Sequence, residues 1–156
     1  MKNNNPAAFL SVIYAEDLRQ EVDNKISLIG IFGGVIPVSG DPPYILPKLG
    51  IFATFRLPAF QVPVEITAKL KLDEEVLLEG APMTARAVVA NAKRAAEATA
   101  VDITLSLVAN NVELKALGTV RVEFLVGDQL YGDQLGRRLA LVQPPAPETG
   151  PTVLNA

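Results

Sequence analysis

Val101-Asp-Ile-Thr-Leu-Ser-Leu-Val-Ala-Asn-Asn-Val-Glu-Leu-Lys-Ala-Leu-Gly-Thr-Val-Arg-Val-Glu-Phe124 is the stretch of this chain that bears most directly on its fold. Apolar residues alternate with polar ones in both halves, which is the period of two typical of a strand with one buried and one solvent-exposed face. Asn110-Asn111, between the halves, has the composition of a tight turn. The stretch therefore predicts a β-hairpin whose two strands are neighbours in one sheet.

The same alternation recurs along the rest of the chain. Val62 to Leu72 alternates strictly, and the polar turn Asp73-Glu74-Glu75 leads into a short apolar run, so we expect a second hairpin there. Pro63 lacks an N–H group, which indicates that this strand begins at a sheet edge. Further strands are expected at residues 9–14, 26–32, 49–56 and 139–142.

The first two of these strands are apolar on both faces, so we expect both to lie centrally in a sheet. Leu10, Val12 and Tyr14 should share one face of the first. Between the second and third strands, four prolines in residues 35–47 indicate an ordered loop or an edge segment.

Seven to eight short strands at this spacing predict an all-β protein, an antiparallel β-sandwich with a closed barrel as the alternative. Residues 84–98 are rich in alanine, with apolar residues at helical spacing and Thr84 in position to cap a helix. We interpret this segment as one possible short helix, while its valine pair leaves a strand open.

The sequence indicates one domain followed by a tail. Residues 1–143 are expected to form the β-sandwich domain. Residues 144–156 form an extended, proline-rich tail, which is either a solvated end or an arm that binds a partner. The prolines of this arm are Pro144, Pro145, Pro147 and Pro151.

The composition excludes several classes of function. The formal net charge is −3, whereas proteins that bind nucleic acid depend on clustered basic residues, so no nucleic-acid partner is expected. The chain has neither cysteine nor histidine, so it lacks thiolate nucleophiles, disulfides and the commonest general base. We therefore expect a protein that is not an enzyme and that uses no cofactor.

A charged stretch lies between the first two expected strands, in residues 14–32. Its acids could supply oxygen ligands to a hard cation, but the spacing differs from that of a calcium loop, and the two basic residues would repel a cation. We therefore expect no metal site and interpret the stretch as a connection held by ion pairs, with Asp23-Asn24-Lys25 as its turn. Arg19 should contact at least one nearby acid. The predicted network comprises Glu16, Asp17, Arg19, Glu21 and Lys25.

Three motifs in the first third of the chain resemble those of a family of small, uncharacterised β proteins from bacteria and prophages. They are Tyr14-Ala-Glu-Asp-Leu-Arg-Gln-Glu, then Lys25-Ile-Ser-Leu-Ile-Gly-Ile-Phe, and later Leu46-Pro-Lys-Leu. The likeness covers about residues 9–55. It implies a small β domain without an assigned activity, and therefore supplies no catalytic residues.

These observations favour a structural or interaction protein that works by association with other protein chains, in an oligomer or a larger assembly. The more specific hypothesis is a component of a phage-like particle, in the capsid or the tail. The alternative is a ligand-binding or regulatory β domain of the bacterial cytoplasm. The apolar runs are too short to cross a membrane, and we expect no signal peptide and no membrane partner.

Overall fold

The computed structural model describes residues 9–59, 64–85, 100–131 and 138–145. No helix in these ranges has the length and apolar character needed to cross a membrane. Their strands are β1 (Phe9–Gln20), β2 (Ile26–Ile31), β3 (Val35–Pro37), β4 (Tyr44–Pro58), β5 (Val64–Leu72), β6 (Glu75–Glu79), β7 (Met83–Ala85), β8 (Ala100–Leu114), β9 (Thr119–Val126), β10 (Gln129–Tyr131) and β11 (Leu139–Val142).

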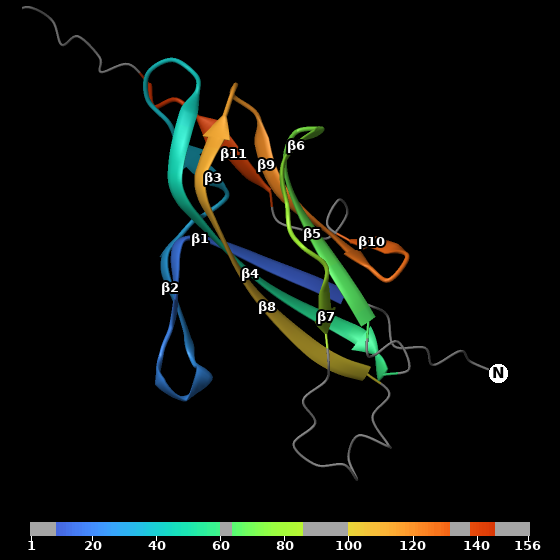
Figure 1. Cartoon of the computed structure of the whole chain (residues 1–156). Coiled ribbons are helices and arrows are strands. Elements are labelled where there is room, and N and C mark those ends of the chain that lie inside the picture. Colours follow the sequence, from blue (N-terminus) through green and yellow to red (C-terminus); the bar gives the residue numbers. More distant parts are fainter. Residues whose placement is uncertain (1–8, 60–63, 86–99, 132–137, 146–156) are drawn as a thin grey trace, which may run out of the picture.

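The strands form two sheets packed face to face (Figure 1). Sheet A has the order β2-β1-β4-β8. Sheet B has the order β3-β11-β9-β5-β6, with β10 paired to β9 and β7 paired to β5. The pairs are antiparallel except β3 with β11. The predicted all-β, sandwich-like fold is therefore confirmed.

The core lies between the sheets and contains the inward side chains of both. Leu10, Val12 and Tyr14 of β1 are buried on one face, as the alternation predicted. Phe55 of β4 meets Phe124 of β9 edge to face, with ring centroids 4.9 Å apart. This contact joins the middle strands of the two sheets at a geometry that aromatic pairs favour.

The predicted hairpin between residues 101–107 and 114–124 is wrong. β8 continues through Asn110-Asn111 to Leu114 and pairs along its length with β4 in sheet A, whereas β9 belongs to sheet B. The chain crosses between the sheets at residues 115–118. Alternation predicts which face of a strand is buried, but it does not identify the strand's partner.

The asparagine pair marks a change of face inside β8. Asn111 has a φ of 50°, a left-handed conformation that asparagine tolerates better than most residues. Before it Ala109 points inward, and after it Val112 points inward, so the alternation shifts by one residue. β4 shifts at the same level, between Leu46 and Leu49, which keeps the two strands in register.

The predicted hairpin of β5 and β6 and the predicted buried face of β5 are confirmed. β5 pairs with β6 through the turn after Leu72, and Ile66, Ala68 and Leu70 alternate inward. Pro63 lies outside the described residues. The strand that follows it is nevertheless central, because β9 pairs on one side of β5 and β6 with β7 on the other.

Two predictions near the N-terminus need correction. β1 runs to Gln20, so much of the predicted charged connection is strand. Its remainder contains a 3-10 turn, Val22–Asn24. β1 is central as predicted, but β2 lies at the edge of sheet A, where its three isoleucines are exposed and Leu28 is half-buried.

The possible helix at 84–98 lies mostly outside the described residues. Its proposed capping residue, Thr84, belongs to β7 and pairs with Glu65 of β5. The expected last strand is present as β11. The segment at 35–47, expected as a loop or an edge, contributes the edge strand β3, but its last four residues belong to β4, a central strand of sheet A.

Candidate functional site

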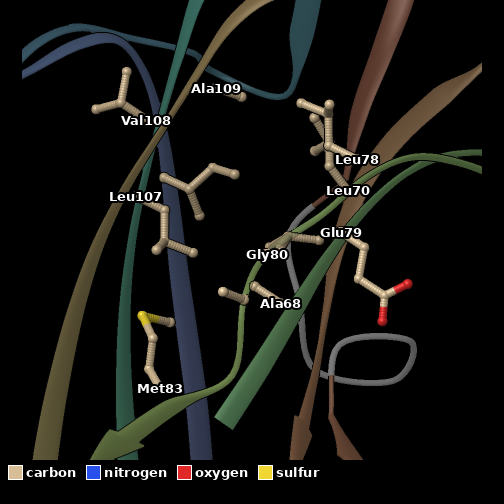
Figure 2. Close-up of a pocket in the computed structure, with 12 residues that line it drawn as sticks. Ala68, Leu70, Leu78, Glu79, Gly80, Met83, Leu107, Val108 and Ala109 are labelled. Carbon is tan, nitrogen blue, oxygen red and sulfur yellow. The ribbon is translucent and has the colours of Figure 1, made fainter.

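An apolar groove of about 420 Å³ opens at one side of the sandwich, between β8 of sheet A and the β6–β7 segment of sheet B. Figure 2 shows side chains from both sheets around it. It is lined by Ile51, Ala68, Leu70, Leu78, Glu79, Gly80, Ala81, Met83, Leu107, Val108, Ala109 and Val122.

The groove reaches the core because its walls carry small residues. Ile51, Leu70 and Val122 are buried core residues that also line it. Ala68 of β5 and Ala109 of β8 line it from opposite sheets, and their short side chains leave space that a larger residue would fill (Figure 2). Its volume lies in the range of pockets that hold small molecules or inserted side chains.

The rim of the groove is apolar and accessible. The side chains of Leu78 and Val108 are 44% and 43% exposed. Glu79 is the charged residue of the lining, and its carboxylate lies 3.4 Å from the ammonium group of Lys69. The groove therefore favours an uncharged occupant.

A free strand edge runs beside the groove. β8 pairs with β4 on one side and has no neighbour on its other side within the described chain. An unpaired edge presents a row of backbone N–H and C=O groups that can accept another strand. Between Ile103 and Val112 this edge carries no charged side chain. Backbone hydrogen-bonding groups and an apolar groove thus lie together.

The charged stretch of β1 forms a smaller network than predicted. The predicted contact of Arg19 with a nearby acid is present, since its Nε lies 3.3 Å from Oδ2 of Asp17. Lys48 of β4 binds the other oxygen of Asp17 at 2.9 Å. The hydrogen bond from Lys48, and to a smaller extent that from Arg19, holds the pKa of Asp17 below its usual value. Lys48 was missed because only the pairing of β1 with β4 brings it near Asp17.

The other members of the predicted network do not join it. Among the described residues, no ion pair involves Glu16, Glu21 or Lys25. The carboxylate of Glu16 lies against Gly30 of β2, where a Cβ atom would clash with it. Within the described chain no cluster of acids has the composition of a metal site.

A second charged cluster lies on the outer face of sheet B. Arg121 and Glu123 of β9 are buried and share an ion pair of 3.2 Å. Lys71 of β5 binds the same glutamate at 3.2 Å, and Glu74 binds Arg121 at 3.0 Å, which lowers the pKa of Glu74. The alternation placed these residues on the polar face, but nothing in the sequence showed their burial.

The start of the tail is fixed to the end of the sandwich. Gln143 Nε2 donates hydrogen bonds to the carbonyl of Gly40 at 2.9 Å and to the hydroxyl of Tyr44 at 3.1 Å. Tyr44 pairs with Leu114, so the tail leaves where β4 begins and β8 ends. Pro144 and Pro145 are exposed, whereas Pro147 and Pro151 lie outside the described residues.

Comparisons with known proteins do not assign the groove. No protein-family model, no curated protein and no solved structure matches the chain. The resemblance to bacterial and prophage β proteins therefore stays a prediction.

Proposed function

We propose that this chain is a non-enzymatic association protein whose groove receives an extended segment of a neighbouring protein chain. The observation that carries the proposal is the position of the groove directly beside the free edge of β8. An added strand gains affinity from main-chain hydrogen bonds and specificity from alternate side chains that enter pockets.

A strand uses this site more fully than a small apolar molecule does. A small molecule would fill the space beside Leu107 and Ala109 but leave the backbone groups of β8 to water. A strand paired with β8 would satisfy those groups and place every second side chain over the groove.

The occupant we assign is the proline-rich tail of a neighbouring copy. Residues 151–156, Pro-Thr-Val-Leu-Asn-Ala, carry no charged side chain, as the groove requires. Val153 and Leu154 give either face of such a strand an apolar side chain. The prolines before them restrict the unbound tail, which lowers the entropic cost of docking.

The length of the tail suits this assignment. The eleven residues 146–156 span at most about 36–40 Å when extended. Ala109, in the groove, lies five residues from Leu114 along β8, which corresponds to about 17 Å. A tail that enters from the Leu114 end runs antiparallel to β8.

Repeated docking of tails into grooves would link copies head to tail. Such heterologous contacts generate rings or open filaments. On this basis we propose the chain as a structural component of a phage-like particle, and the resemblance of residues 9–55 to prophage-borne β proteins supports the choice. The alternative, a cytoplasmic ligand-binding domain, would use the same groove for a small apolar molecule.

Sedimentation of the full chain over a range of concentrations tests the proposal. If tails dock, the sedimenting mass of the parent grows with concentration. Val153→Asp combined with Leu154→Asp should abolish this growth, and so should Leu78→Lys at the rim of the groove. Leu130→Lys is the matched control, since this exposed leucine of β10 does not line the groove.

Two outcomes contradict the proposal. If both the tail and the groove variants assemble like the parent, the tail does not dock. If instead an apolar small molecule raises the melting temperature of the parent but not of Leu78→Lys, while assembly is unchanged, the groove is a ligand site, because a ligand that binds only the folded state stabilises it.

A further inference from the structure

The strand edges of the two sheets differ in their protection against pairing. β3 ends at Pro37, and β6 begins and ends with glutamate, which are common ways to discourage an added strand. The middle of β8 carries neither a proline nor a charged residue, and the docking of a tail proposed above explains why this edge is left open. β2, Ile-Ser-Leu-Ile-Gly-Ile, also has no charge and no proline.

β2 belongs to a two-stranded arm. β1 pairs with β4 only as far as Ala15 and Gly50, and from there to Gln20 its ladder is with β2. Figure 1 shows the β1–β2 turn projecting away from sheet B. Isolated two-stranded ribbons have marginal stability in water, so this arm gains from further pairing.

The arm exposes apolar side chains instead of covering them. Ile29 and Ile31 are 37% and 57% exposed, and Val22 at the turn is 82% exposed. Neither the groove beside β8 nor the hollow lined by Val38 and Gln143 includes a residue of β2. The edge therefore suits a partner that brings an equally apolar strand backed by a sheet.

We infer that β2 pairs antiparallel with β2 of a second copy across a two-fold axis. The two four-stranded sheets then form one continuous sheet, and two unprotected edges disappear at once. The identical strands are self-complementary, because neither has charges that would select a different partner.

The charges that flank β2 favour this orientation. Lys25 precedes the strand, and the carboxylate of Glu16 lies near its other end, against Gly30. Neither has an ion-pair partner among the described residues. Antiparallel pairing brings Lys25 of one copy to the end where Glu16 of the other lies, whereas parallel pairing would bring like charges together.

The full chain carrying Val153→Asp and Leu154→Asp is the background for the test, because tail docking is then removed. This protein should be a dimer, and Ile29→Lys should weaken the dimer at least tenfold in analytical ultracentrifugation. Val108→Lys, at the edge of β8, should leave the dimer intact. A monomeric background protein, or a dimer that only Val108→Lys disrupts, would overturn the inference without affecting tail docking.

Single cysteines locate the axis, since the chain has none of its own. In the same background, Ser27→Cys, Leu28→Cys and Ile29→Cys should differ in disulfide yield, with a maximum at the residue nearest the two-fold axis. Directly opposed residues on antiparallel strands lie about 4.5–5.5 Å apart, within disulfide range. Equal yields at all three positions, or yields no higher than for Val108→Cys, would refute antiparallel pairing.

Discussion

Tyr14 shows how a single side chain can bind the two sheets together. Its buried hydroxyl accepts a hydrogen bond of 2.9 Å from the backbone N–H of Val122. On its side away from β5, β9 pairs with β11 at residues 119–120 and with β10 at residues 124–126. Val122 therefore lies in the gap between these two partner strands. The phenol takes the place of a strand partner there.

Tyr14→Phe removes this acceptor and leaves a buried N–H group unsatisfied. We expect it to lower the free energy of unfolding by about 1–3 kcal/mol, measured by urea denaturation. Tyr131→Phe is the control, because the hydroxyl of Tyr131 binds the exposed Gln129. Equal effects of the two substitutions would contradict the role given to Tyr14.

The same hydroxyl should make stability depend on alkaline pH. Burial raises the pKa of Tyr14 from 10.0 to about 12, because the ionised phenol would lose its hydration. Since the folded-state pKa is the higher one, the stabilisation is complete below pH 10 and is lost as pH rises from 10 to 12. The difference in unfolding free energy between the parent and Tyr14→Phe should therefore shrink over this range, and a constant difference would contradict the assignment.

The position and the core-facing side of individual strands could be predicted from the sequence better than the strands with which they pair. The alternation in β5 and β9 identified the residues that point into the core, although it did not show that Arg121 and Glu123 on the outer face of β9 are buried too, and the turn after Leu72 identified a true hairpin. The ladder between β4 and β8 runs from Tyr44 with Leu114 to Pro58 with Ala100. Its paired residues are up to 70 positions apart in the sequence, so no local pattern specifies this pairing. For the same reason the sequence did not reveal the groove, which forms where two sheet edges meet.

Gly50 lies where the pairing of β1 with β4 ends and the two-stranded β1–β2 arm begins. A Cβ atom there would lie 2.7 Å from Cγ of Leu18 and 3.3 Å from the backbone of Asp17. Gly50→Ala should therefore push β1 from β4 and lower the unfolding free energy by about 1–3 kcal/mol. Gly33→Ala, where a Cβ meets nothing within 4 Å, is the control, and equal thermal stability of the two variants would show that the arm adapts.

At the scale of the whole molecule, the two free edges lie in different parts of sheet A and suit different partners. β8 has an apolar groove beside it and is assigned to a neighbour's tail, whereas β2 is an uncharged, largely exposed edge and is assigned to its own counterpart. A chain with one head-to-tail contact and one two-fold contact can build an extended lattice. The composition predicted association, but only the arrangement of the sheets indicates where it would occur.

Amide hydrogen exchange tests the central claim most directly. The full chain with Val153→Asp and Leu154→Asp is mixed with a synthetic peptide of residues 146–156 carrying the native sequence. We predict slower exchange at alternate amides of Ile103 to Val112, because every second N–H of an edge strand points to an added partner. Unchanged exchange along β8 at saturating peptide, or protection confined to another strand, would contradict docking of the tail at this edge.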